Sequence, residues 1–135
     1  MAWSPCNFRR TTLPAGDLQR IYDLLTGLLR AIQGGAPGAL AQYGISAAIY
    51  EEMLEELEAG AACLASLALP AWERALTPDR SGRVDFDCYP TQEPGTLRMT
   101  CRLWSAGRPG ELSLTADYCP GQAASPLQFR LLEVQ

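Results

Sequence analysis

The sequence predicts an α+β protein in which N-terminal helices pack on one face of a four-stranded antiparallel meander. Two periodicities lead to this prediction. Apolar residues recur every three or four positions in the first half of the chain, and at every second position after residue 83. The length, 135 residues, is that of a domain that buries its own core. We therefore expect a single domain over residues 1–135, mainly helical over 1–78 and antiparallel sheet over 79–135.

The first helix is predicted to begin after residue 16 and to end at Gly34-Gly35, because glycine accepts the left-handed conformation that terminates helices. Its apolar stripe has helical spacing and consists of Leu18, Ile21, Leu25, Leu28 and Ile32. A short helical piece is expected over residues 37–43, where a proline opens the segment and a glycine follows it.

A second long helix is predicted to start after Ser46, whose hydroxyl can accept a hydrogen bond from the first turn, and to run to Gly60. Its inward positions are Ile49, Met53 and Leu57. Residues 61–69 are small and apolar, so a buried helix and an extended run both stay open for them. Another short helix is expected over residues 71–76, between two prolines.

Four strands are then predicted, at residues 84–89, 97–104, 111–118 and 127–134. Each strand is apolar on one side and polar on the other, as in a sheet that helices cover on one face only. The turn segments between the strands, residues 90–95, 105–110 and 120–126, hold six or seven residues, whereas a parallel crossover needs about a dozen or more. The strands should therefore pair as antiparallel neighbours. This element order is similar to that of the cystatin-like and NTF2-like proteins.

Composition excludes several functional classes. Histidine and lysine are both absent, and all eleven basic residues are arginine. Histidine-based triads, histidine-containing zinc shells, Schiff-base chemistry and a phosphate-binding P-loop lysine are therefore ruled out. The net charge of −4 argues against general nucleic-acid binding.

The chain is also expected to be soluble and cytoplasmic, without contact to a membrane. No apolar run approaches the ~18 residues that span a bilayer. The first ten residues, MAWSPCNFRR, carry charge where a signal peptide needs an apolar segment. Neither a cofactor nor a metal is expected.

The five cysteines show no zinc-type spacing and are expected to be thiols. They are Cys6, Cys63, Cys88, Cys101 and Cys119. Cys88 and Cys101 fall on the inward side of neighbouring predicted strands, which favours buried thiols, with a redox pair between those strands as the alternative.

The outward residues of the four predicted strands alternate in charge from one strand to the next. In chain order they are Asp85 and Asp87, then Arg98 and Arg102, then Glu111 and Asp117, then Arg130. Neighbouring strands would place opposite charges across from one another, so a structural charge ladder is predicted. The alternative for the first pair, a site for a hard cation, lacks a third ligand nearby in sequence.

Tyrosines offer the remaining route to catalysis. Tyr22, Tyr43, Tyr50 and Tyr118 can place a phenol beside a carboxylate in a pocket between helix and sheet, as a histidine-free isomerase or lyase requires. The sequence singles out no such pair, which favours structural roles for the tyrosines.

The second long helix has an acidic face with no basic residue to balance it. Within residues 46–60 the charged residues are Glu51, Glu52, Glu55, Glu56 and Glu58. A solvated surface is one interpretation. The functional interpretation is a docking surface for a basic partner, with Trp104 and Trp3 as aromatic anchors. The predicted partner-binding residues are these five glutamates and Trp104.

The run LWSAGRPGELSL at residues 103–114 and the tail LLEV at residues 131–134 resemble the strand-turn-strand end of small uncharacterised bacterial proteins with helices before an antiparallel sheet. In size, acidity and lack of a catalytic set, the chain is also similar to cytosolic immunity proteins of bacterial toxin systems. These resemblances imply a binding role, as a monomer or homodimer.

The function predicted from the sequence is therefore that of a non-enzymatic immunity protein, which occludes the active site of a basic toxin. Two alternatives stay open. One is an acidic secretion chaperone that holds an effector segment in an apolar groove. The other is a small NTF2-like isomerase or lyase, which would need a polar cavity between helices and sheet.

Overall fold

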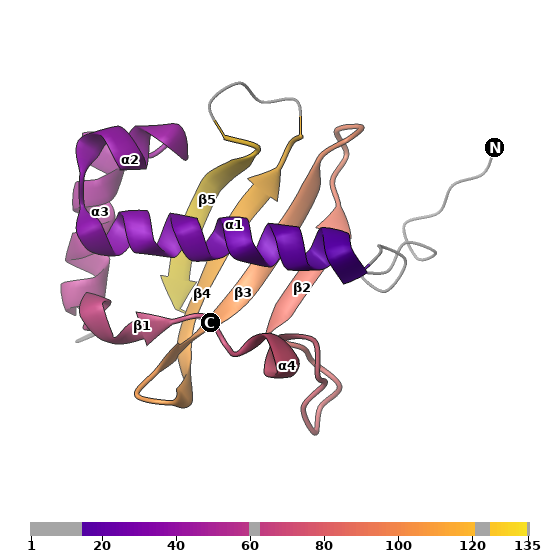
Figure 1. The fold of residues 1–135 in the computed structure, drawn as a ribbon. Coiled ribbons are helices and arrows are strands. Elements are labelled where there is room, and N and C mark those ends of the chain that lie inside the picture. Colours follow the sequence, from indigo (N-terminus) through magenta and orange to yellow (C-terminus); the bar gives the residue numbers. More distant parts are fainter. Residues whose placement is uncertain (1–14, 60–62, 121–124, 135) are drawn as a thin grey trace.

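The computed structural model describes residues 15–59, 63–120 and 125–134, and it confirms the α+β class (Figure 1). The helices are α1 (Ala15–Gly34), α2 (Pro37–Gln42), α3 (Ala47–Ala59) and α4 (Trp72–Ala75). The strands are β1 (Leu67–Ala68), β2 (Phe86–Pro90), β3 (Leu97–Ser105), β4 (Arg108–Tyr118) and β5 (Leu127–Val134). The three longest strands lie behind α1, which crosses one face of the sheet (Figure 1).

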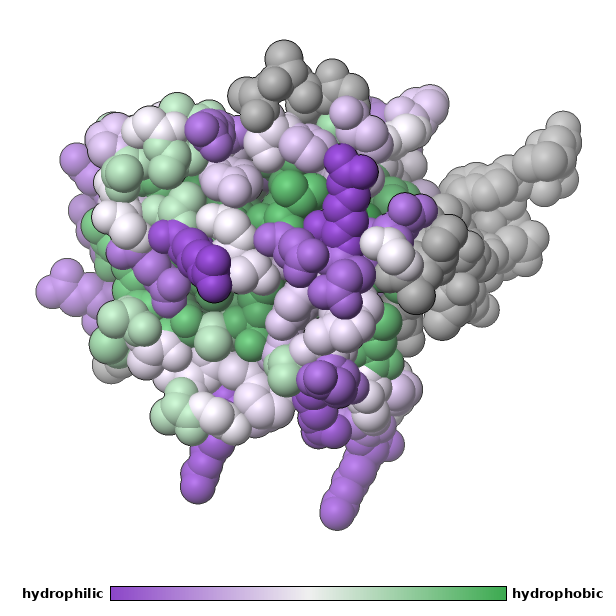
Figure 2. All heavy atoms as spheres, viewed as in Figure 1, coloured by the Kyte–Doolittle hydropathy of each residue, from purple (hydrophilic) through white to green (hydrophobic). Residues whose placement is uncertain are grey.

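Helix α1 carries the predicted apolar stripe and turns it toward the sheet. Its five predicted inward residues are all buried: Leu18, Ile21, Leu25, Leu28 and Ile32. The helix ends at Gly34, as predicted, because Gly35 adopts a φ of 73° and donates its N–H to the Ala31 carbonyl at 2.9 Å. Hydrophilic side chains stand over the outer face of α1, with hydrophobic surface beside them (Figure 2).

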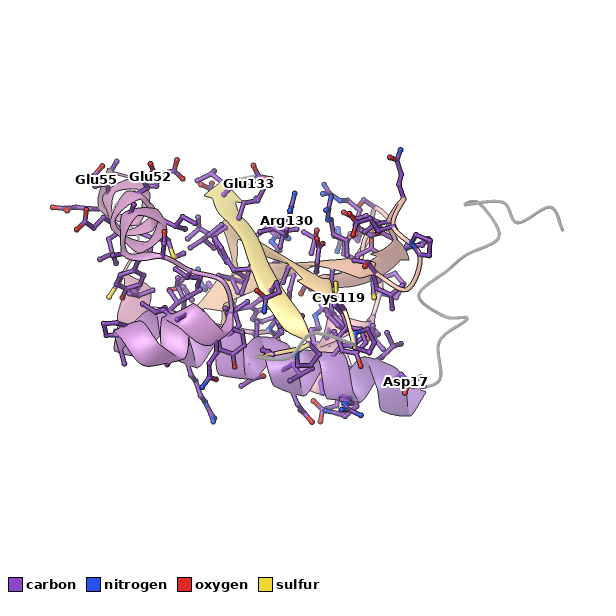
Figure 3. All side chains as sticks on the ribbon, turned by 90° about the horizontal axis from the view of Figure 1, so that it is seen from above. Asp17, Glu52, Glu55, Cys119, Arg130 and Glu133 are labelled. Carbon is purple, nitrogen blue, oxygen red and sulfur yellow. The ribbon has the colours of Figure 1, made fainter. Side chains whose placement is uncertain are left out.

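Helix α3 begins where the sequence predicts and is tied to the end of α1. The Ser46 hydroxyl oxygen accepts a hydrogen bond from the Ile49 N–H at 3.2 Å, which satisfies one donor of the first turn. The Tyr50 hydroxyl donates to the Ile32 carbonyl at 2.7 Å. These contacts place α3 next to β5 at the edge of the sheet, where Met53 and Leu57 lie beside the inward-facing Leu132 (Figure 3).

The two helices bury their apolar sides to different extents. In α3, Met53 and Leu57 are buried as predicted. Ile49, which the sequence predicts to face the core, is 40% exposed because it borders the space between α3 and β5. The buried residues that α3 contributes to the core are therefore two side chains that lie one helical turn apart.

Residues 63–69, for which helix and extended run were both open, form a short mixed segment. Leu64–Ser66 make one 3-10 turn, and β1 follows by pairing with Trp104 and Ser105 of β3. The Gln33 side chain donates to the carbonyls of Leu64 and Leu67, at 3.1 and 2.7 Å, and fixes this segment under α1. Residues 61 and 62 lie outside the described ranges.

The sheet confirms the predicted antiparallel meander, since β2, β3, β4 and β5 are successive antiparallel neighbours. Strands β1 and β2 pair with the same edge of β3. Strand β2 pairs with residues 97–101 of β3, and β1 pairs with Trp104 and Ser105, which makes β1 a fifth strand of the sheet. Strand β5 forms the opposite edge of the sheet. The register between β4 and β5 shifts where Thr115 pairs with Leu131 and Ala116 pairs with Phe129, so Arg130 is the extra residue of a bulge.

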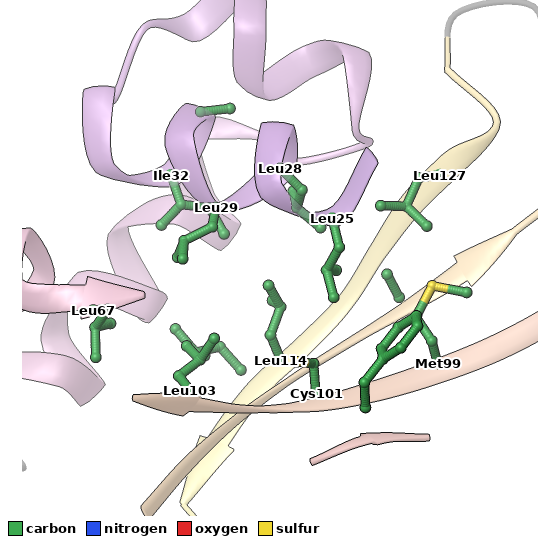
Figure 4. Packing of buried hydrophobic residues seen from close by; sticks show 14 of the residues in the cluster. Leu25, Leu28, Leu29, Ile32, Leu67, Met99, Cys101, Leu103, Leu114 and Leu127 are labelled. Carbon is green, nitrogen blue, oxygen red and sulfur yellow. The ribbon is translucent and has the colours of Figure 1, made fainter. Parts of the chain in front are cut away.

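The core lies between α1 and the inner sheet face (Figure 4). The sheet contributes fully buried residues at every second position of β2 and β3 and from β4 and β5: Phe86, Cys88, Met99, Cys101, Leu103, Leu114, Ala116 and Leu127. This alternation is the one that the sequence predicts for strands half-covered by helices. No helix in the described ranges is long and apolar enough to cross a membrane.

Candidate functional site

All five glutamates of α3 are exposed to solvent. The ion pairs found within the described part of the chain join Arg98 and Arg130 to Asp117. None of the five glutamates has a basic nitrogen of the described residues within 4.0 Å. Among the residues that the structure describes, the acidic helix that the sequence singles out is therefore a negative surface without a balancing cation. Its field is available to a charged partner.

The helix divides these five glutamates into two groups. Glu52 and Glu56, one turn apart, line the space between α3 and β5. Glu51, Glu55 and Glu58 share the side of α3 that points away from β5, because 3.6 residues complete each turn. Sequence reasoning treated the five as one surface, and the structure separates those that border β5 from those that do not.

The space between α3 and β5 is a surface groove, which we call the α3–β5 groove. It consists of two adjoining hollows of about 260 and 480 Å³ that share Met53, Glu56 and Leu132. Its apolar lining is Ile49, Met53 and Leu57 from α3, Leu112 from β4, and Phe129, Leu131, Leu132 and Val134 from β5. Three of these side chains are unusually exposed: Ile49 at 40%, Leu131 at 39% and Val134 at 61%.

Acidic side chains border this groove on both sides. Glu52 and Glu56 line it from α3, and Glu133 lines it from the end of β5. Arg130 is the basic lining residue, and its Nε lies 3.7 Å from an Asp117 carboxylate oxygen. Glu52, Glu133 and Arg130 all project to the side of the sheet opposite α1 (Figure 3). The groove is therefore apolar along its length and negative at its rim.

Trp104, the aromatic candidate, does not belong to this groove. It lies on β3, which β4 separates from β5, and its indole N–H donates to an Asp85 carboxylate oxygen at 2.9 Å. The indole is half-buried and helps to fix the segment before β2 against the sheet. Trp3, the second aromatic candidate, lies outside the described residues.

The predicted charge ladder forms in part on the outer sheet face. Arg98 binds both carboxylate oxygens of Asp117 across the β3–β4 pair, at 2.7 and 3.2 Å, and Arg130 approaches the same carboxylate from β5. Asp117 thereby raises the pKa of the Arg98 guanidinium. Asp85 binds Trp104 instead of an arginine, and the Arg102 guanidinium donates to the Gly110 carbonyl at 2.7 Å.

A second hollow, of about 650 Å³, opens on the outer face beside β2 and β3. Its charged lining has mixed sign: Asp79, Arg83, Asp85, Asp87, Arg102 and Glu111. Asp79 has a structural role there, since hydrogen bonds from Ser81 and from the Arg83 N–H hold its carboxylate and lower its pKa. No group of three or more acids, cysteines or histidines in the described residues is arranged to hold a metal.

The space between α1 and the sheet, where a catalytic pocket was the alternative, is filled with apolar side chains (Figure 4). The Tyr22 hydroxyl donates to the Pro70 carbonyl, and burial raises the pKa of this phenol and that of Tyr43. Tyr50 donates to the Ile32 carbonyl, as described above. Tyr22 and Tyr50 thus serve the fold by satisfying backbone carbonyls.

The thiols of the inner face are buried, as predicted. Burial raises the pKa of Cys88 to about 12 and raises that of Cys101 further. The two residues do not pair across the strands, because Cys101 lies opposite Phe86 and Cys88 lies opposite Met99. Cys88, Cys101, Cys63 and Cys119 are all free thiols, and Cys6 lies outside the described residues.

Sequence reasoning missed the β5 side of the groove. Leu131 and Glu133 point to the outer face of β5 opposite Thr115 and Ser113, and Leu132 points inward opposite Leu114. The signal in the sequence was the pair Leu131-Leu132, where the alternation of apolar and polar residues breaks. Two adjacent leucines place apolar side chains on both faces of an edge strand, which the core alone does not require.

Comparison of the chain with models of protein families, with curated proteins and with solved structures finds no match. The resemblances stated from the sequence are therefore still predictions, and the functional argument depends on the site itself.

Proposed function

We propose that this protein binds a basic protein partner through the surface formed by α3 and β5. The observation that carries the proposal is an exposed apolar groove that Glu52, Glu56 and Glu133 border, with the other three glutamates of α3 on the far side of the same helix. Exposed apolar side chains supply contact energy when they are covered, and the surrounding charge selects the partner and speeds encounter.

The most specific form of the proposal is an immunity protein, which neutralises a toxin by covering its active site. A toxin that cleaves nucleic acid or binds membranes is commonly basic, and an acidic inhibitor would oppose that charge. Steric blockage requires no catalytic group in the inhibitor. The filled space between α1 and the sheet and the structural hydrogen bonds of the tyrosines agree with such a role.

A secretion chaperone is the second candidate, and the α3–β5 groove favours it specifically. A chaperone of this kind holds an unfolded effector segment, for which an exposed apolar groove is the minimal requirement. The two candidates differ in the state of the partner, which is folded for a toxin and unfolded for an effector segment.

The test begins with capture of a partner on the immobilised protein at low salt, followed by measurement of its association rate. The quadruple variant Glu51→Gln, Glu52→Gln, Glu55→Gln, Glu56→Gln should associate about tenfold more slowly than the wild type at low ionic strength. The difference should shrink as salt screens the field.

A matched control removes the same number of acids elsewhere on the surface. Asp17, Asp23, Glu73 and Glu93 are exposed and lie outside α3, so their change to Asn or Gln should leave the association rate nearly unchanged. Equal rates for the wild type and the α3 variant at low salt would refute steering by this helix. A captured partner that binds only when unfolded would favour the chaperone over the immunity protein.

A further inference from the structure

We propose that the α3–β5 groove binds an extended, cationic segment of the partner, whose backbone adds as a strand to the free edge of β5. This inference rests on the proposed protein-binding function and assigns to it a mode of recognition. Strand addition beside a helix uses backbone hydrogen bonds for affinity and alternate side chains for specificity.

The edge of β5 has the hydrogen-bonding groups that such a strand requires. Strand β5 pairs with β4 on one side only. Along its other edge, the backbone hydrogen bond found in the described residues is that of the Phe129 N–H, which donates to the Tyr43 carbonyl at 2.8 Å. From residue 130 to residue 134, no backbone partner within the described chain meets this edge. An unpaired edge of this kind is a template for another strand.

The occupant must be extended and not helical. A helix has already used its backbone N–H and C=O groups within itself, so it cannot satisfy the edge of β5. In an extended segment, successive side chains would alternate between the α3 side, near Ile49, and the outer side of the sheet, near Leu131. Covering Ile49 and Leu131, at 40% and 39% exposed, removes apolar surface from water.

The charge of the rim determines the charge of the occupant. Glu52, Glu56 and Glu133 line the groove, and the guanidinium of Arg130 is directed to Asp117. Arginine or lysine residues at the alternate positions of the segment would lie near these carboxylates. An acidic segment would meet three like charges, so the rim rejects it.

The probe is a set of synthetic peptides of about ten residues, the length of a long strand, in which arginine alternates with Val, Ile, Leu or Phe. A matched set carries glutamate in place of arginine. Nuclear magnetic resonance of the full-length protein should show shifts for α3 and β5 residues, with slowed hydrogen exchange at the β5 amides, for the arginine set only. No binding of any arginine peptide below about 1 mM would overturn the proposal.

Backbone pairing is tested by two versions of the best peptide, N-methylated at odd or at even positions. Each version loses the N–H donors of one strand edge and keeps those of the other. One version should bind like the parent and the other should lose at least about tenfold in affinity, because only one edge faces β5. Equal affinity of the two versions would show that no strand is added.

Variants of the protein locate the site. Ile49→Gln and Leu131→Gln should each weaken the peptide about fivefold. The matched control is Leu54→Gln, because Leu54 is 37% exposed on the same helix and does not line the groove. Equal losses for all three variants would refute the groove as the binding site.

Two pairs of glutamates distinguish this inference from the proposed function. Glu52→Gln with Glu56→Gln should weaken the peptide severalfold at moderate salt, whereas Glu51→Gln with Glu55→Gln should not. If both pairs slow a protein partner equally and neither affects the peptide, the acidic surface steers partners but the groove does not bind a strand. Dimerisation of the free protein through β5 would assign this edge to a second copy and contradict the proposal.

Discussion

Two helices approach the same sheet, and they meet it in different ways. Helix α1 crosses the inner face and buries five residues of its stripe, each 4% exposed or less. Helix α3 stands at the β5 edge, buries Met53 and Leu57, and leaves Ile49 and the groove beside it open. The amphipathic pattern is stronger in α1 than in α3, and the two helices also lie against different parts of the sheet.

This contrast separates stability from binding. The α1 interface is a closed apolar layer in which each buried methylene group favours the folded state. The α3 interface is half-closed and keeps apolar side chains, strand edge and acids accessible together. We expect changes under α1 to alter the free energy of unfolding, and changes along the groove to alter binding.

The largest effect is expected from Leu25→Ala, because Leu25 is fully buried between α1 and the sheet. Loss of its side chain should lower the free energy of unfolding by about 2–5 kcal/mol. Ile49→Ala, in the groove, should cost less than about 1 kcal/mol. Urea denaturation of both variants measures the difference, and similar losses would show that the two interfaces are equally important for folding.

The buried thiols under α1 make stability depend on alkaline pH. The pKa of Cys88 rises from 9.0 to about 12 on folding, so the native state retains a proton that the unfolded chain releases. The stabilisation is complete below pH 9 and is lost as the pH rises toward 12, at up to about 1.4 kcal/mol per pH unit.

Urea denaturation at pH 8 and pH 10 tests this dependence, with Cys88→Ala as the matched variant. The wild type should lose more stability than the variant between the two pH values. Thiol labelling of the native protein gives a second check, because exposed Cys63 should react while Cys88 and Cys101 stay protected. Equal labelling rates would mean that the inner face opens readily to solvent.

Asp117→Asn probes the outer face of the sheet, which α1 does not cover. The Asp117 carboxylate is 14% exposed and binds Arg98 through two hydrogen bonds. Its loss should cost about 1 kcal/mol, since ion pairs near the surface contribute little. Chemical denaturation of this variant at low and high salt should show a smaller cost at high salt.

The smallest effect is expected at Ser113, on the outer side of β4. Its hydroxyl is buried and, among the described residues, has no hydrogen-bond partner. Ser113→Ala should leave the free energy of unfolding unchanged within about 0.5 kcal/mol, or raise it, because removing an unsatisfied polar group releases its desolvation penalty. A clear loss of stability would reveal a partner for this hydroxyl.

Local signals in the sequence were sufficient for most of the fold. Gly35 ends α1 and Ser46 caps α3, and both act through the backbone of their own turn. Strand β1 was not predicted, because a two-residue strand has no periodicity and depends on β3 for its existence. The bulge at Arg130 was not predicted either, since register is a property of two strands together.

The candidate site was predicted only from the α3 side. The sequence shows the five glutamates as an unbalanced run of charge. Which of them border β5 depends on how α3 is placed against the sheet, which the sequence does not show. Trp104 was a reasonable anchor by its outward position, yet Asp85 binds its indole N–H. Periodicity does not predict a hydrogen bond between two side chains that lie far apart in the sequence.

The unbalanced glutamates also set how the free protein responds to its solvent. Glu51 repels Glu55, and Glu52 repels Glu56, by a few tenths of a kcal/mol per pair, and no cation of the described chain relieves this repulsion. Dissolved salt screens it, so α3 should become more stable, and its amides better protected, as ionic strength rises. A basic partner would provide the same relief at one place on the surface. Part of the energy of binding would then appear as stiffening of the helix that receives the partner.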